Sequence, residues 1–454
     1  MFFEKLLFKL VSFRNYREIC GMRKSFCIAL LVIAASSIAW CIYRDIQHEK
    51  QYPGDLRNRI VGARLQKDGT PPYFYKWKSA DGLRYYDPQN FDSLKVSNIT
   101  ATPFLHGMFY PLADLQQRQI SKIWLLIEYL LWLFITAIIF SFAKNSRQKL
   151  AVIFTASLFL YTAAWNNHII AGQVYLLIPF FALLFYYFIG KKQKILFAIL
   201  AATSAAILIL IRPTAVLFLL PFLILVKRYT PKYLVTFFAT FLFVFVLAFA
   251  TGKNLLYWKD YNTALKQQLK LHQSLNPETQ TNEPNPAFEN VEEWNMADVH
   301  KQNEAAPLDG NKEHGNVFVI INNLLHTKIS LQLLSMLTLI SLLGITGLFF
   351  LQNKGVKPSL YSITIFAYLA YMLTDLFSPI HRFQYNGVQW IFPVMLAASG
   401  YSKKYFWIFM LMVAGLLLNS VEFSFMPMEN TMGEFIIFLS LLIFSCKYKP
   451  ETTL

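Results

Sequence analysis

The sequence predicts an all-α membrane protein that crosses the bilayer about twelve times. Of its 454 residues, 55% are hydrophobic, 17% are aromatic and only 15% are charged. The mean hydropathy is +0.39, and soluble domains of ordinary composition are neither this apolar nor this poor in charge. Apolar runs of roughly 17–25 residues, the length of a membrane-spanning helix, recur along the chain. We place the expected spans at residues 25–43, 123–143, 150–165, 173–190, 195–211, 214–226, 233–250, 328–350, 359–377, 387–399, 405–420 and 433–446.

The chain begins with a basic segment, residues 1–24, in which Lys and Arg alternate with Phe, Leu and Val. This pattern is typical of an amphipathic segment that lies on the anionic inner leaflet. No small-residue cleavage site follows the first apolar run, so we expect a retained helix and not a removed signal peptide. Residues 25–454 are expected to form one transmembrane domain.

The short loops between the expected spans carry most of the clustered Lys and Arg residues. Counted along the chain, these loops fall on one side, at residues 144–149, 191–194, 227–232, 354–357, 403–404 and 447–449. The positive-inside rule therefore places both termini in the cytoplasm and makes this a multi-pass protein of the inner membrane. The two long loops, residues 44–122 and 251–327, then face outward. The second begins with a predicted interfacial helix that runs to about residue 275.

The net charge of +16 indicates contact with anionic membrane lipids. Nucleic acid is not expected as a partner, because no compact basic domain is present. The four cysteines show neither disulfide nor zinc spacing. A metal site near Asp55 would need a set of ligands such as two carboxylates and a histidine at close spacing, and neither outer loop contains such a set. We therefore expect no metal and no other cofactor.

Asp55, in the first long loop, is the candidate for acid–base chemistry. A carboxylate beside arginines just outside a membrane could remove a proton next to a bound anion. Helical i, i+4 spacing would place Arg59 on the same face as Asp55. The alternatives are that Asp55 is a solvated acid of a polar loop, and that Arg59 only forms an ion pair with it.

Arginine suits a phosphate because its planar guanidinium donates two parallel hydrogen bonds and keeps its charge. Arg212 lies between two apolar runs, where an ionisable group needs a partner or a water-filled cavity, unless it extends to the interface. His381 and Arg382 lie together at one expected outer helix end. His168 lies at another, near Gln173, although a lone histidine such as His168 is more often structural. The candidates for binding a phosphate group are Arg59, Arg212, His381 and Arg382, and those for other substrate contacts are Arg64, Tyr73, His168 and Gln173.

Five short motifs, in order over about residues 50–400, resemble those of glycosyltransferase family 87. They comprise Asp55 with Ala63, Leu65, Gly69, Pro71 or Pro72 and Tyr73; Thr102-Pro103-Phe104 and Tyr110-Pro111-Leu112-Ala113 before Trp124; Gly172-Gln173-Val174-Tyr175-Leu176-Leu177; Ala201 to Arg212-Pro213; and Ser378-Pro379-Ile380-His381. Two positions depart from the family pattern. Tyr175 stands where the family usually has Asn, and His381 where it often has Trp.

The resemblance implies a GT-C-like helical bundle and a transferase that uses a polyprenyl-phosphate sugar, often mannose. It implies that Asp55 is the general base of an inverting reaction whose acceptor is a glycan or glycolipid hydroxyl at the outer membrane face. The two departures bear on which sugar is used. Two other functions stay open from the residues alone: a transporter or flippase of a lipid-linked anion, and an assembly protein without catalysis.

Overall fold

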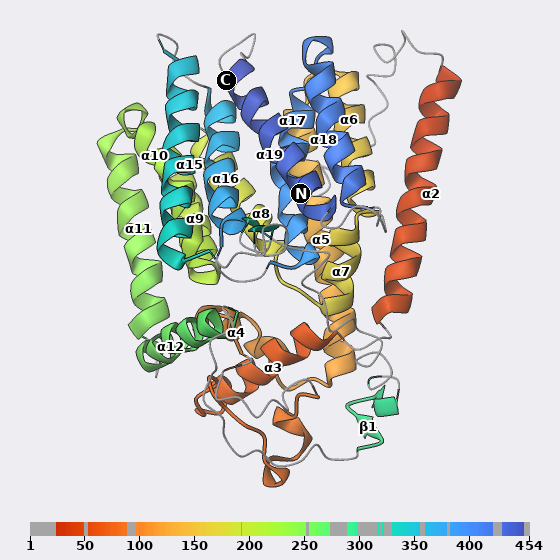
Figure 1. Ribbon diagram of the computed structural model, residues 1–454, viewed down its shortest axis with the longest axis vertical. Helices are drawn as coiled ribbons and strands as arrows, with labels where there is room; N and C mark the ends of the chain where they lie inside the picture. The colour runs from red at the N-terminus through yellow and green to blue at the C-terminus, as the bar shows by residue number, and fades with distance from the viewer. Residues whose placement is uncertain are drawn as a thin grey trace.

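The chain folds into a bundle of helices with a second layer of shorter helices across one end (Figure 1). The computed structural model describes residues 24–49, 53–88, 97, 99–191, 193–250, 254–272, 288–297, 299, 316–317, 320–321, 329–354, 359–378, 382–420 and 429–448. Within these residues the only strands are the short antiparallel pair β1 (Asn290–Val291) and β2 (Trp294–Asn295). This helical content agrees with the expected all-α membrane protein.

The bundle contains α2 (Lys24–Glu49), α5 (Gln117–Phe142), α6 (Ser146–Phe159), α7 (Ala163–Ala171), α8 (Leu177–Ile189), α9 (Ile195–Ile211), η4 (Pro213–Phe218), α10 (Leu219–Ile224), η5 (Val226–Arg228), α11 (Pro231–Ala250), α15 (Leu331–Gln352), α16 (Leu360–Leu376), η6 (Gln384–Trp390), α17 (Ile391–Ser399), η7 (Lys403–Tyr405), α18 (Phe406–Leu418) and α19 (Glu429–Lys447). The second layer contains α3 (Gly54–Lys67), η2 (Ser79–Tyr85), α4 (Pro103–Met108), η3 (Tyr110–Leu112) and α12 (Asn254–His272).

Each expected span coincides with a helical segment, but the helices differ in length. Among the described residues, α5, α11, α15 and α19 are long and apolar enough to cross a membrane. Shorter apolar helices include α8, α9, α16 and the η4–α10 segment. The count of about twelve spans therefore stays a prediction.

Lysine-bearing loops lie together at one end of the bundle. The α10–α11 loop, the α17–α18 loop and the C-terminal end of α19 lie at the top in Figure 1, opposite α3, α4 and α12. This arrangement agrees with the expectation that the lysine clusters share one side. Which side is cytoplasmic stays a prediction.

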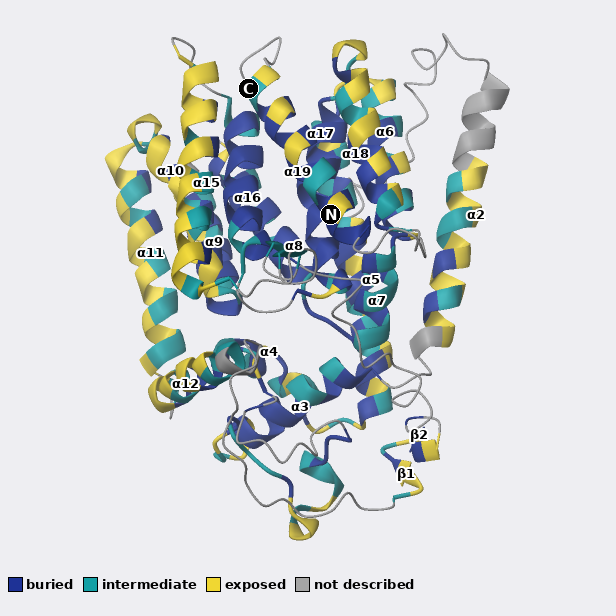
Figure 2. Ribbon diagram, in the orientation of Figure 1, coloured by how far each residue is buried: buried dark blue, intermediate teal, exposed yellow. Residues whose placement is uncertain are grey.

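The first long loop is not an irregular segment but a packed helical layer. Leu56, Ile60 and Ala63 of α3 join the main core, whereas Val61 and Leu65 pack with aromatic residues of α12. Because α3 packs on two sides, most of its residues are buried, and Figure 2 draws much of the helix in dark blue. Packing from both sides fixes α3 and the residues that it presents to the bundle.

Two buried arginines fasten this layer. Arg57 donates to the backbone oxygen of Tyr86 at 2.7 Å, and Arg64 donates to the backbone oxygen of Ala113 at 2.8 Å. Both also form ion pairs with Glu292, at 2.9 and 2.6 Å. Breaking a buried pair of this kind leaves an uncompensated charge and costs about 3–5 kcal/mol. These contacts therefore hold α3 in place.

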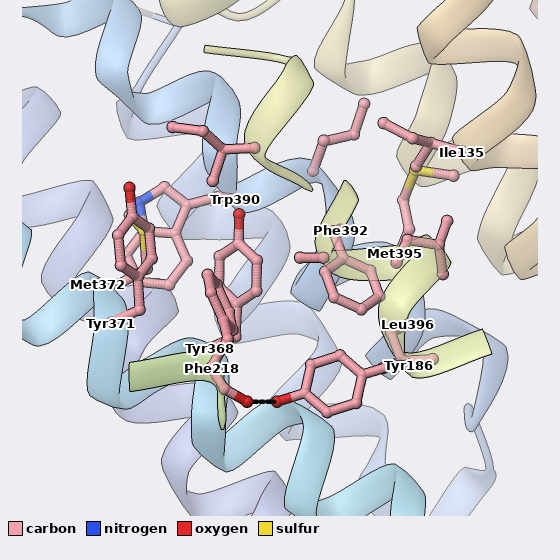
Figure 3. Close-up of a cluster of buried hydrophobic side chains, with 14 of the residues drawn as sticks. Ile135, Tyr186, Phe218, Tyr368, Tyr371, Met372, Trp390, Phe392, Met395 and Leu396 are labelled. Carbon is pink, nitrogen blue, oxygen red and sulfur yellow. Dashed lines mark hydrogen bonds between the residues drawn. The ribbon is translucent and has the colours of Figure 1, made fainter. Parts of the chain in front are cut away.

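The centre of the bundle is aromatic. Figure 3 shows Tyr186 of α8, Phe218 of η4, Tyr368 of α16 and Phe392 of α17 packed around one point. The Tyr186 hydroxyl donates to the carbonyl oxygen of Phe218 at 3.1 Å. A buried tyrosine needs such a partner, because an unpaired hydroxyl costs free energy in an apolar core. The packing holds α8, η4, α16 and α17 together.

Candidate active site

A cavity of about 450 Å³ separates the second layer from the facing ends of the bundle helices. Its residues come from α3, α4 and α12 on one side and from α8, α9, α16 and η6 on the other. The lining residues are Asp55, Asn58, Arg59, Asp87, Thr100, Ala101, Thr102, Leu105, Gln173, Val174, Tyr175, Ile178, Ile211, Arg212, Tyr261, Leu265, Gln268, Asp375, Ser378, Arg382, Phe383, Tyr385 and Asn386. Sequence analysis named five of these as site residues: Asp55, Arg59, Gln173, Arg212 and Arg382.

Asp55, Arg59 and Gln173 form a hydrogen-bonded chain at the cavity wall. Arg59 donates through Nη1 to the backbone oxygen of Asp55 at 2.6 Å and through Nη2 to Oε1 of Gln173 at 2.5 Å. Nε2 of Gln173 in turn donates to Oδ2 of Asp55. Because arginine can only donate, the amide oxygen of Gln173 must face Arg59 and its NH₂ group must face Asp55. Arg59 thus acts on the Asp55 carboxylate through Gln173 as well as through its charge.

The environment of Asp55 tunes the basicity of the carboxylate. Asp55 is partly buried in the first turn of α3. Burial raises the pKa of its carboxyl above the ordinary value, while the Arg59 charge and the Gln173 hydrogen bond act in the opposite direction. A carboxylate with a raised pKa accepts a proton more readily than an exposed one does. Within the described part of the chain, Oδ1 of Asp55 accepts no hydrogen bond, which leaves that oxygen open to the cavity.

Gly172 brings Gln173 to Asp55. It ends α7 in the left-handed conformation, with φ of +65°, which favours glycine. A Cβ atom at this position would lie 2.6 Å from Cβ of Leu56 and 2.9 Å from Cβ of Pro53. Any larger residue would therefore push α7 away from the start of α3. The turn geometry and the close approach together place Gln173 beside Asp55.

Opposite Asp55, four charged side chains form a buried network. Asp375 accepts from Arg212 at 2.8 Å and from Arg382 at 2.6 Å. Arg382 also donates to Glu434, whose other oxygen accepts from Trp390 at 2.7 Å. Two cations and two anions balance, as buried charges require. Nη2 of Arg382 and Nε of Arg212 are buried without a hydrogen-bond partner within the described part of the chain.

Arg212 is the most accessible member of this network. Its side chain is 32% exposed, compared with 2% for Arg382. Its guanidinium carbon lies 5.8 Å from the ring centre of Tyr175, which stacks on Tyr385 at 5.7 Å. Tyr385 stacks in turn on Phe383 at 5.3 Å. A cation and a line of aromatic rings therefore line the same cavity as Asp55.

Three of the residues expected at the site lie apart from the cavity. Arg64 is committed to Glu292 and to backbone oxygens of the second layer. Tyr73 is buried and donates to the backbone oxygen of Ala101 at 2.7 Å. His168 is fully buried beside Glu128, with Nε2 3.0 Å from that carboxylate. These contacts place all three in the packing outside the cavity, and for His168 they agree with the structural alternative that sequence analysis left open.

His381 lies outside the described residues. Asp375, Glu434 and Tyr385 were missed by sequence analysis, and Tyr175 was noted only as a departure from the family pattern. An acid inside an apolar helix, as Asp375 is in α16, is a signal that could have been used, because such groups normally mark a site. In the part of the chain that the structure describes, no three His, Cys, Asp or Glu side chains come together as metal ligands would.

Residues 100–283 match the family model of glycosyltransferase family 87, which supports assignment of the chain to that family. The match indicates a membrane glycosyltransferase that acts on a sugar donor and an acceptor. The matched segment contains Gln173, Tyr175 and Arg212, and Asp55 and Asp375 lie outside it. No curated protein sequence and no solved structure gives a significant match.

Proposed function

We propose that the protein transfers a hexose, mannose in the first instance, from a polyprenyl-phosphate sugar to a hydroxyl of a glycan or glycolipid at the outer face of the inner membrane. The observation that carries this proposal is one cavity with a hydrogen-bonded carboxylate, Asp55, on one wall and an accessible guanidinium, Arg212, on the other. Displacement at an anomeric carbon requires a base and a group that stabilises the leaving phosphate. The cavity supplies both.

In the proposed reaction, Oδ1 of Asp55 accepts the proton of the acceptor hydroxyl as that oxygen attacks the anomeric carbon. The bond from the anomeric carbon to the phosphate oxygen breaks, and the polyprenyl phosphate leaves with the electron pair. A single displacement inverts the anomeric configuration. Gln173 keeps Oδ2 occupied, so that Oδ1 is the oxygen presented to the acceptor.

Arg212 is the proposed first contact of the donor phosphate, since it is both accessible and only partly engaged by Asp375. Arg382 contributes through Nη2, which has no hydrogen-bond partner among the described residues, and His381, its neighbour in sequence, is proposed as a further phosphate contact. Arg59, which lies beside the proposed base Asp55, adds positive charge that attracts the donor phosphate. The apolar side chains of Ile178 and Ile211 line the cavity on the bundle side and suit the start of the polyprenyl chain.

A screen of purified protein against radiolabelled polyprenyl-phosphate hexoses tests the proposal. We expect release of polyprenyl phosphate with at least one hexose, and formation of a product of inverted configuration. Transport of the intact donor across a vesicle membrane without cleavage would instead support a flippase. Cleavage with retention would contradict Asp55 as the base of a single displacement.

A further inference from the structure

The two walls of the cavity differ in charge. The bundle wall carries Arg212 and Arg382 against Asp375. On the outer wall Arg59 is the one cation among the described lining residues, and both of its terminal nitrogens are committed to Asp55 and Gln173. The other side chains of the outer wall include Asn58, Asp87, Thr100, Gln268, Tyr261 and Leu265. This wall is therefore polar without being positive.

Asn58 is the outer-wall residue best placed to contact an acceptor. It follows Asp55 by three positions in α3, and i, i+3 residues share a helix face. Its Nδ2 donates to Oδ2 of Asp87 at 3.2 Å, which joins α3 to the segment after η2. The amide and carboxylate of this pair thus lie beside the proposed base, on the same wall.

The side chains from α12 complete the wall. Nε2 of Gln268 donates to the backbone oxygen of Ser97 at 2.7 Å, and this bond fixes the amide against the second layer. Tyr261 and Leu265 are one helical turn apart, so they present an aromatic ring and an aliphatic side chain along one face. Planar polar groups beside an apolar surface suit a sugar, which has hydroxyls around its edge and C–H groups on its faces.

We infer that this wall is the acceptor subsite, and that it binds a neutral, hydroxyl-rich sugar through Asn58 and Asp87. The inference rests on the proposed function. An acceptor with a phosphate or carboxylate here would lie beside the anions Asp55 and Asp87, and like charges at short range oppose binding. The donor phosphate belongs to the bundle wall, so the two substrates meet at Asp55 from opposite sides.

The test uses the full-length protein in detergent, the labelled polyprenyl-phosphate hexose that the screen identifies, and two acceptors that differ by one group. These are an octyl hexoside and the matched octyl uronide, in which a carboxylate replaces the primary alcohol. We expect the neutral glycoside to be used at least about tenfold better. Asn58→Ala should raise the KM for the neutral acceptor by about tenfold, the loss expected for one hydrogen bond, with a change of less than about twofold in the donor KM.

Asp87→Asn should narrow the preference for the neutral acceptor over the uronide, because it removes the repelling charge. Gln119→Ala removes an exposed amide of α5 that does not line the cavity, and it should behave as wild type. Thermal unfolding of each variant checks the fold, and Asn58→Gln should recover part of the acceptor affinity. Two results would overturn the proposed subsite, provided that the protein still hydrolyses the donor with water. They are equal use of the two acceptors by the wild type, and an unchanged acceptor KM in Asn58→Ala. Absence of any donor turnover in wild type would overturn the proposed function itself.

Discussion

Replacement of Asp55 by asparagine tests the core of the mechanism, because it removes the base and keeps the shape. The introduced amide oxygen can still accept from Nε2 of Gln173, so the bridge from Arg59 can persist. The group left facing the cavity is then an NH₂, which donates and cannot take up a proton. General-base catalysis is typically worth about 10²–10⁴-fold, which corresponds to about 3–5 kcal/mol of activation free energy. We expect kcat to fall by this factor and the donor KM to change little.

The assay is release of labelled polyprenyl phosphate under saturating acceptor, with thermal unfolding as a check on folding. Asp114→Asn is the matched control, because Asp114 is an exposed carboxylate of the second layer outside the cavity. The pH dependence adds a second readout. Asp55 acts when deprotonated, so the rate should rise with pH through a pKa that burial holds above the ordinary value of an aspartate, and the variant should lose this rise. Near wild-type turnover in Asp55→Asn would refute the reasoning.

Three further predictions concern the phosphate contacts, the α7 turn and the topology. Arg212→Ala should cost about 2–5 kcal/mol of transition-state stabilisation, measured as kcat/KM for the donor. Arg382→Ala should lower donor use and the unfolding temperature together, whereas Arg382→Lys should recover only part, because an ammonium cannot reproduce the guanidinium geometry. Gly172→Ala should reduce kcat through displacement of Gln173 and should lower the unfolding temperature, since it meets both a positive φ and a Cβ contact of 2.6 Å. In a cysteine-free background, a Cys introduced at Lys192 should resist an impermeant reagent from outside, and one introduced at Asn285 should react.

Arg118→Ala serves as the control for the arginine variants, because Arg118 lies on α5 away from the cavity and makes one exposed contact at 3.5 Å. Unchanged donor kinetics in both arginine-to-alanine variants would move the phosphate site toward Arg59. Wild-type kinetics in Gly172→Ala would show that Gln173 does not need the turn. External labelling at Lys192 would invert the topology.

Much of the fold follows from local pattern. Apolar runs predicted the positions of the bundle helices, and the aromatic start of the second long loop predicted α12. The helical layer around α3 was harder, because α3 buries arginines together with its apolar residues and so does not show the separate polar and apolar faces of an amphipathic helix. Its burial depends on α12, about two hundred residues later, and no local window contains that information.

The site was predicted in parts. Asp55 and Gln173 were each named, but their contact across 118 positions depends on the turn at Gly172. Arg64 has the same residue type as Arg212, yet its partners include backbone oxygens, which no residue pattern displays. Asp375 and Glu434 were missed because a single acid in an apolar run does not show which cation it meets. Tertiary structure decides which arginine is available to a substrate.

The buried charge network also bears on how the protein is assembled in the bilayer. A helix with a lone carboxylate is costly to insert, and α16 and α19 each contribute one acid to the network. During synthesis Arg212 emerges first, then Asp375 and Arg382, while Glu434 follows 52 residues after the arginine that it binds. Until α19 arrives, Arg382 and Trp390 both lack this acceptor. Helix α19 therefore completes the neutralisation of the network: without Glu434, the two arginines share Asp375 alone and one positive charge is left over.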